Sequence, residues 1–176
     1  MMARDMTAQA PLLAEAFSEV AALAELLTSR SLRVAVAESC TGGLLGAVLT
    51  AVPGSSDYML GGVIAYANQV KTGLLGVPAP MLAEHGAVSE PVARAMAEGV
   101  RSRLGADLGA SITGVAGPAS EGSDKPPGLV YVAVAGPGQV IRVVRLDSDL
   151  GREGNRAAAV HTALALLGDA AAEAPG

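Results

Sequence analysis

A short apolar segment that ends in a polar, glycine-containing turn most constrains the fold of this chain. Val34–Ala37 is a run of small and β-branched apolar residues, which is typical of a buried strand. Glu38-Ser-Cys-Thr-Gly-Gly43 follows, and Leu44–Val52 then has the small, apolar pattern of a helix. A strand that turns directly into a helix gathers hydroxyl and main-chain N–H groups at the helix N-terminus, where an anion or a developing oxyanion is favoured. An ordinary turn in which Ser39 or Thr41 caps the helix is the alternative interpretation.

The other patterns alternate between helices and strands along a single domain. Because helices separate the first strands and a hairpin follows, we expect a three-layer α/β/α sandwich with a mixed, largely parallel sheet. We assign residues 1–10 to a flexible leader, 11–168 to the domain and 169–176 to a flexible tail. The predicted helices are 11–29, 44–52, 68–76, 89–104 and 152–167, and the predicted strands are 34–37, 58–66, 108–113, 128–135 and 140–146.

Charge and composition exclude several classes of partner. The net charge is −5 without a basic cluster, so we expect no nucleic-acid partner. No apolar stretch reaches the roughly 18 residues of a membrane span, so we expect no membrane association. Cys40 is the single cysteine, which excludes an internal disulfide and favours the reducing cytoplasm.

The sequence gives little support to metal, triad or P-loop chemistry. His85 and His161 stand alone, and no paired-histidine or multi-cysteine spacing occurs, so we expect neither a metal nor another cofactor. The nucleophile motif Gly-x-Ser-x-Gly is absent, and neither glycine-rich turn continues into Gly-Lys-Ser/Thr.

A serine paired with a lysine remains as candidate machinery. The chain has 12 basic residues, of which only Lys71 and Lys125 are lysines, and a lysine can give up its proton where an arginine cannot. Ser39 follows the first strand and Lys71 follows the next one, in the first turn of a helix capped by Asn68. To act as base near neutral pH, Lys71 needs a pKa lowered from about 10.4 to about 7, which costs roughly 4 kcal/mol.

One further residue could assist this pair, and another could replace Ser39 as nucleophile. Tyr66 lies five positions before Lys71 and could orient or relay its proton. Cys40 is the rival nucleophile, because Glu38, Lys71 and Cys40 are the residue types of a nitrilase-like amidase. If Ser39 points into the crevice, Glu38 points to the opposite strand face.

Two glycine-rich turns, 41–43 and 114–117, both follow predicted strands. In open α/β sheets, ligands bind beyond the carboxyl ends of strands. If the first and third strands are parallel neighbours, both turns face one crevice that Tyr66 and Lys71 can also reach.

Several motifs occur together along the chain: Ala37-Glu-Ser-Cys-Thr-Gly-Gly43, Pro53-Gly-Ser-Ser56, Gly62-Val-Ile-Ala-Tyr-Ala-Asn68, Val70-Lys71, Leu75-Gly-Val77, His85-Gly-Ala-Val-Ser-Glu90, Ser111-Ile-Thr-Gly-Val-Ala-Gly-Pro118 and Lys125-Pro-Pro-Gly128. In these motifs the chain resembles the CinA C-terminal domain family, the competence/damage-inducible family whose members also occur alone as nicotinamide-mononucleotide (NMN) amidohydrolases. The similarity covers about residues 12 to 168.

The resemblance implies hydrolysis of the NMN carboxamide to nicotinate mononucleotide and ammonia without a metal. It implies Ser39 as nucleophile, Lys71 as base and Tyr66 as its partner. Further contacts to phosphate, ribose or oxyanion are implied for Thr41, Gly42, Gly43, Thr113, Gly114 and Gly117. We also expect a homo-oligomer. The rival interpretations are a non-catalytic nucleotide-binding or regulatory module, and an amidase for a different pyridine or amide substrate.

Arg152 and Arg156 share a helix face and are the candidate phosphate ligands. Surface ion pairs with Asp147, Asp149 or Glu153 are the alternative. The chain has Leu150-Gly151-Arg152 where the family usually has Gly-Asp-Arg, so a local difference is expected before the last helix.

Overall fold

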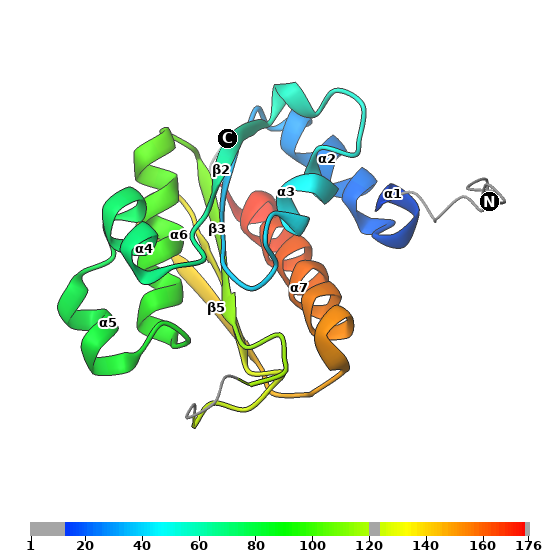
Figure 1. Cartoon of the computed structure of the whole chain (residues 1–176). Helices are drawn as coiled ribbons and strands as arrows, with labels where there is room; N and C mark the ends of the chain where they lie inside the picture. The colour runs from blue at the N-terminus through cyan, green and yellow to red at the C-terminus, as the bar shows by residue number, and fades with distance from the viewer. Residues whose placement is uncertain (1–12, 120–123, 175–176) are drawn as a thin grey trace, which may run out of the picture.

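The computed structural model describes residues 13–119 and 124–174, which build a sheet with helices on both faces (Figure 1). The predicted leader lies outside the described residues. The helices are α1 (Leu13–Ala16), α2 (Glu19–Ser29), α3 (Leu44–Leu49), α4 (Asn68–Leu75), α5 (Ala79–His85), α6 (Glu90–Leu104) and α7 (Gly151–Glu173), with short 3-10 turns at Ser55–Asp57 and Pro137–Gln139. The strands are β1 (Val34–Glu38), β2 (Met59–Ile64), β3 (Leu108–Gly114), β4 (Val130–Ala135) and β5 (Ile141–Leu146).

The five strands lie in the order β2-β1-β3-β4-β5. β1 pairs in parallel with both β2 and β3, whereas β4 and β5 form an antiparallel hairpin beside β3. The predicted mixed sheet and three-layer architecture are therefore confirmed. Since β1 and β3 are parallel neighbours, the loops that follow them emerge at the same end of the sheet.

Strand β1 shows how the sequence divides the core into two layers. Its side chains alternate between faces: Val34 and Val36 pack into the cluster formed with α2, α3 and α7, while Ala35 and Ala37 face α6 and its neighbours. Every residue of β1 is buried. A strand that is covered on both faces does not alternate polar and apolar residues, which explains why the sequence of this segment is a continuous apolar run.

At Gly62, strand β2 has no room for a side chain beside β1. A Cβ atom added at Gly62 would lie 2.5 Å from Val36 Cγ2 and 2.9 Å from the Val36 carbonyl oxygen, so only glycine fits there. The strand ends at Ile64, two residues before the predicted end. The main-chain carbonyls of Ala65 and Tyr66 instead face the amine of Lys71.

Several predicted boundaries need correction. The first helix is interrupted between α1 and α2, and Ala67 rather than Asn68 occupies the N-cap of α4. α3 ends at Leu49, before the predicted Val52.

The largest correction concerns the end of the chain. α7 continues to Glu173, so the prediction of a tail from residue 169 is wrong. Ala170, Ala171 and Ala174 are buried against the core, and alanines gave too weak a periodic signal to extend the helix. α7 has 23 residues, yet no helix in the described part of the chain is long and apolar enough to cross a membrane.

Candidate active site

A pocket of about 280 Å³ opens at the end of the sheet where β1 and β3 finish. This volume lies just below the roughly 300–1,000 Å³ that is typical of small-molecule sites. Residues that follow β1, β2 and β3 meet here, together with one side chain from α7. The lining consists of Ser39, Cys40, Tyr66, Lys71, Ala87, Val88, Thr113, Gly114, Val115, Ala116, Gly117, Pro118 and Arg152.

Ser39 and Lys71 are in direct contact although 32 positions separate them in sequence. The Lys71 Nζ lies 3.1 Å from the Ser39 Oγ. It also lies 2.6 Å from the Ala65 carbonyl oxygen and 3.3 Å from that of Tyr66. Lys71 is 1% exposed, so its amine is fixed by these neighbours and shielded from bulk water.

The surroundings of Lys71 favour its neutral form. Burial lowers the pKa of the Lys71 amine, because the charged form loses its hydration. Lys71 lies in the first turn of α4, as predicted, where the helix dipole also disfavours a cation. No carboxylate in the described part of the chain forms an ion pair with Lys71.

Glu38 precedes Ser39, yet its carboxylate is directed to the start of α3 rather than to Lys71. Its Oε2 accepts N–H bonds from Gly43 and Leu45, both 3.1 Å long, and its Oε1 accepts the N–H of Gly46 at 2.8 Å. Because Glu38 is only 1% exposed, this carboxylate serves as a built-in anion for the helix N-terminus. The N–H groups of Gly43, Leu45 and Gly46, at the helix N-terminus where a bound anion was expected, are therefore already bonded.

The turn after Ser39 lies beside the pocket without lining it. Thr41, Gly42 and Gly43 are absent from the lining. The hydroxyl of Thr41 is buried and has no hydrogen-bond partner among the described residues. The expectation that turns 41–43 and 114–117 both face the crevice thus holds only for the second turn.

Cys40 lines the pocket beside Ser39 but is poorly suited to attack. Burial raises the pKa of the Cys40 thiol to about 11. A thiol needs its thiolate form to act as nucleophile, so Cys40 is almost entirely protonated near neutral pH. The Glu38 carboxylate, engaged by main-chain N–H groups, does not complete a nitrilase-like arrangement.

Tyr66 contacts Lys71 through its main chain rather than its phenol. Tyr66 is 63% exposed and lines the pocket. Its hydroxyl has no hydrogen-bond partner within residues 13–119 and 124–174, whereas its carbonyl faces the Lys71 amine. No hydrogen bond among the described residues joins the phenol to Lys71 or Ser39, and its part in proton transfer stays a prediction.

The end of β3 supplies a second wall of the pocket. Thr113 is fully buried, and its hydroxyl donates to the Ala87 carbonyl at 2.8 Å. A Cβ at Gly114 would lie 2.6 Å from Val130 Cγ2, so this glycine is required for packing against β4. Gly117 has φ +104°, a left-handed conformation that glycine adopts without strain.

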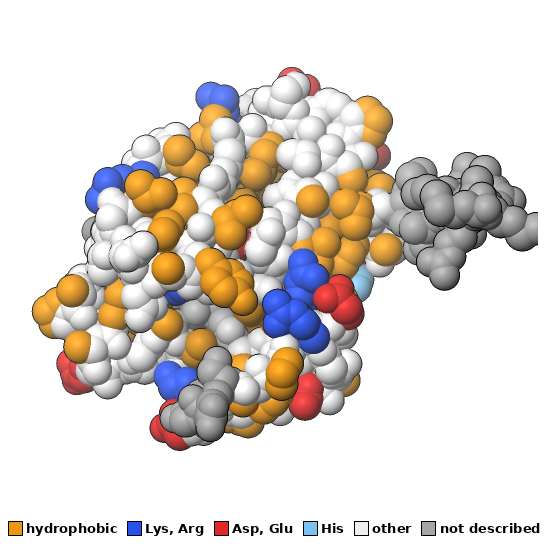
Figure 2. Space-filling view, in the orientation of Figure 1, with side chains coloured by type: hydrophobic (Ala, Val, Ile, Leu, Met, Phe, Trp, Pro, Cys, Tyr) orange, Lys and Arg blue, Asp and Glu red, His pale blue; other side chains and the backbone are white. Residues whose placement is uncertain are grey.

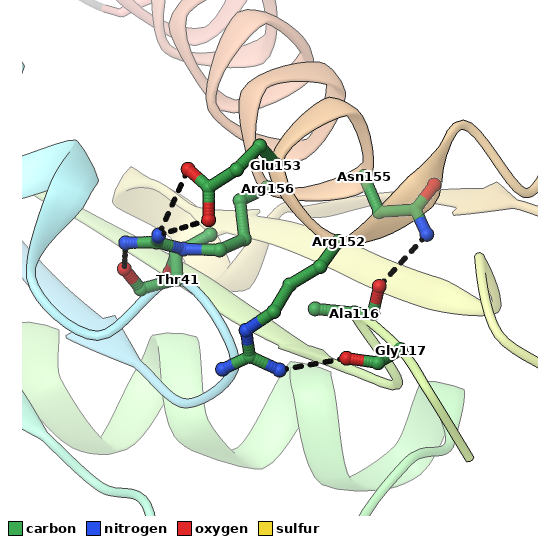
Figure 3. Close-up of polar contacts among 7 residues, drawn as sticks. All are labelled: Thr41, Ala116, Gly117, Arg152, Glu153, Asn155 and Arg156. Atoms are coloured by element: carbon green, nitrogen blue, oxygen red, sulfur yellow. Dashed lines mark hydrogen bonds and ion pairs between the residues drawn. The ribbon is translucent and has the colours of Figure 1, made fainter.

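Side chains from the first turns of α7 contact both the turn that follows β1 and the turn that follows β3 (Figure 3). Arg152 lines the pocket and donates through Nη1 to the Gly117 carbonyl at 2.8 Å. Arg156 donates through Nη2 to the Thr41 carbonyl at 3.0 Å and pairs with Glu153 at 2.9 Å. The predicted alternative of an ion pair with Glu153 therefore describes Arg156, and Arg152 is the arginine that reaches the pocket.

Asn155, for which the sequence predicted no role, ties the start of α7 to the turn after β3. Asn155 is 2% exposed and donates to the Ala116 carbonyl at 2.9 Å and to Asp149 Oδ1 at 3.0 Å. The same Asp149 oxygen accepts the N–H of Gly151 at 3.0 Å. Asp149 thus provides a carboxylate before α7, although the family's usual aspartate is missing. The scarcity of asparagine, which occurs only at 68 and 155, was the available signal.

The second lysine also lies near the pocket. Lys125 donates to the Val88 carbonyl at 2.5 Å and to the His85 carbonyl at 3.0 Å, so it holds the loop that contributes Ala87 and Val88 to the lining. Within the described ranges, no group of three or more His, Cys, Asp or Glu side chains could hold a metal ion.

Charged side chains gather at one border of this region. On the face shown in Figure 2, Lys and Arg side chains lie together with acidic ones over the start of α7. Apolar side chains are distributed in small groups over the rest of this face.

The chain is similar in sequence to one known protein family and to curated proteins. The family model of the CinA C-terminal domain matches residues 17–171. A CinA-like protein of Gloeobacter violaceus is 54% identical over 147 residues, which cover 83% of this chain and 34% of that protein. A CinA-like protein of Gemmatimonas aurantiaca is 66% identical over 116 residues, covering 66% of this chain and 27% of the relative. The chain thus spans about a third or less of the length of these curated relatives.

Solved structures match over nearly their whole length. The competence/damage-inducible protein CihA of Agrobacterium tumefaciens has a TM-score of 0.83 and 36% identity, covering 86% of this chain and 93% of that one. A CinA superfamily protein of Klebsiella pneumoniae has a TM-score of 0.84 and 35% identity, covering 89% and 98% respectively. On the family match, the identities and the shared fold, this chain belongs to the CinA C-terminal domain family.

Proposed function

We propose that this domain is an amidohydrolase that converts nicotinamide mononucleotide to nicotinate mononucleotide and ammonia through a Ser39–Lys71 pair. The observation that carries the proposal is the 3.1 Å contact between the Ser39 hydroxyl and a buried lysine amine with a lowered pKa. A serine hydroxyl needs a base to attack an amide, and a neutral lysine can supply it.

The neighbours of Lys71 suit this role. A neutral amine has two N–H groups and one lone pair. The two N–H groups match the carbonyls of Ala65 and Tyr66, which leaves the lone pair for the Ser39 hydroxyl proton. This arrangement orients the base without a carboxylate, which would raise the lysine pKa.

The reaction then follows in two halves. Lys71 takes the Ser39 proton while Oγ attacks the carboxamide carbon, and the tetrahedral adduct collapses to an ester as Lys71 returns the proton to the departing ammonia. In the second half, Lys71 removes a proton from water, which attacks the ester carbon. The proton returns to the Ser39 oxygen, so one water is consumed and one ammonia and one carboxylic acid are released.

Incubation of the protein with NMN is the direct test. We expect ammonia and nicotinate mononucleotide in equal amounts, with a rate unchanged by excess EDTA, because Lys71 supplies the base in this mechanism. The products are measured by coupled ammonia detection and by chromatography. NMN that binds without release of ammonia would favour the non-catalytic module instead, and activity lost to EDTA and restored by a divalent ion would contradict the proposed chemistry.

The two arginines of α7 provide a matched pair of variants. Arg152→Ala should raise KM for NMN about tenfold or more, because a charge-assisted hydrogen bond contributes roughly 1.5–3 kcal/mol. Hydrolysis of nicotinamide riboside, which lacks the phosphate, should be slow in the wild type and little changed by Arg152→Ala. Steady-state kinetics with both substrates checks this expectation.

Arg156→Ala is the control for that experiment. Its guanidinium is bound to Glu153 and to the Thr41 carbonyl, so its loss should lower stability or kcat without changing the preference for the phosphorylated substrate. Equal turnover of riboside and mononucleotide by the wild type would refute phosphate recognition by either arginine.

A further inference from the structure

Tyr66 has an unusual environment for a tyrosine of this protein. The chain has three tyrosines. The Tyr58 hydroxyl donates to the Leu49 carbonyl at 2.5 Å, and the Tyr131 ring lies 5.9 Å from the guanidinium of Arg145. Tyr66 has neither kind of contact among the described residues, and 63% of it is exposed although it lines the pocket.

The backbone that carries this exposed ring is nevertheless fixed. Ala65 is fully buried, and the carbonyls of Ala65 and Tyr66 both accept from the Lys71 amine. The ring therefore projects from a main-chain segment that is tied to the candidate base. An aromatic ring that has an uncovered surface and is carried by a fixed main-chain segment is suited to contact a ligand.

The strand order fixes where this ring lies relative to the other groups. Ser39 follows β1, the strand between β2 and β3. Tyr66 follows β2 on one side of β1, and Arg152 is bonded to Gly117 after β3 on the other side. Tyr66 and Arg152 thus flank Ser39 from two sides of the pocket, so a ring attached to a carboxamide at Ser39 can be contacted from the Tyr66 side.

The charges of the lining add a constraint on the ligand. The described lining contains Lys71 and Arg152 but no Asp or Glu. The ring of NMN is a pyridinium and carries a positive charge, and a lining that holds the Arg152 guanidinium but no carboxylate needs another source of attraction for it. An aromatic face attracts a cation lying over it, by about 0.5–2 kcal/mol.

We propose that the Tyr66 ring is a specificity-determining surface that covers the cationic pyridinium of the substrate and thereby selects N-substituted pyridinium amides over neutral aromatic amides. This inference rests on the proposed function for the identity of the substrate. It assigns Tyr66 a role in binding through its ring and assigns the phenol hydroxyl no part in proton transfer.

Tyr66→Phe and Tyr66→Leu form the matched test, because the first removes only the hydroxyl and the second removes the aromatic face while keeping apolar bulk. Equilibrium binding is measured by calorimetry in a Ser39→Ala background, which prevents turnover. The two probes are NMN and its neutral-ring isostere, the ribotide of benzamide. Tyr66→Phe should change both Kd values by less than about threefold.

Tyr66→Leu should weaken NMN binding by about 2- to 30-fold, which is the cation–aromatic attraction converted at 1.4 kcal/mol per tenfold. Tyr66→Leu should raise the Kd of the neutral isostere by a smaller factor than the Kd of NMN. A merely structural role for Tyr66 would raise both Kd values by the same factor. An equal loss for both probes, or no binding of NMN to the Ser39→Ala protein, would overturn the proposal.

Kinetics with an intact Ser39 separate this inference from the proposed function. If NMN binds with the predicted dependence on Tyr66 but no ammonia is released, the proposed hydrolysis fails while the role of Tyr66 in binding stands.

Discussion

Replacing Ser39 with alanine is expected to lower ammonia release from NMN by about a thousandfold or more, the scale seen when a nucleophile is removed from a hydrolase. Ser39 is the hydroxyl that contacts the Lys71 amine, and no covalent intermediate can form without it. Single-turnover and steady-state assays measure the loss. Thermal unfolding of the variant shows whether the fold is retained.

Cys40→Ala is the matched control at the neighbouring position. The thiol is buried with a pKa of about 11, so its removal should leave most of the activity and cost only a modest amount of stability. A folded Cys40→Ala protein without activity, together with an active Ser39→Ala protein, would reverse the assignment of the nucleophile.

Lys71→Arg is expected to reduce kcat by roughly a hundredfold or more, the usual scale for loss of a general base. Arginine keeps the positive charge but does not deprotonate near neutral pH, so it cannot accept the Ser39 proton. Because the larger guanidinium must enter a site where lysine is 1% exposed, Lys71→Met provides a second variant of similar length without a base. Near-normal kcat in either folded variant would rule out the serine–lysine mechanism.

The pH dependence provides an independent check on Lys71. The neutral amine is the active form, so activity should rise with pH through a pKa that burial holds below the value of about 10.4 for a free lysine. Between these two pKa values the unfolded chain binds more protons than the folded one, so the free energy of unfolding should also increase with pH. Lys71→Met should lack this contribution. A pH–stability profile unchanged by Lys71→Met would contradict the lowered pKa.

Much of the architecture could be predicted because its signals are local. The apolar run of β1 and the glycine-rich turn after it lie within a few residues of the features they specify. Helix ends were less predictable. α7 extends to Glu173 because its buried alanines pack against the core, and alanine patterns are too weakly apolar to show that face in the sequence.

The sequence by itself determined the residue types available for chemistry: a serine and a cysteine after the first strand, one lysine after the next, and two arginines on the last helix. Only the tertiary structure decided which atoms these side chains face. It directs Glu38 to the N–H groups of α3, brings the Lys71 amine to Ser39 and two carbonyls, and separates Arg152 in the pocket from Arg156 at Thr41. Hydrogen bonds and desolvation act over a few ångströms, and Arg156 and Thr41 are 115 positions apart in the chain, so no local pattern could record their contact.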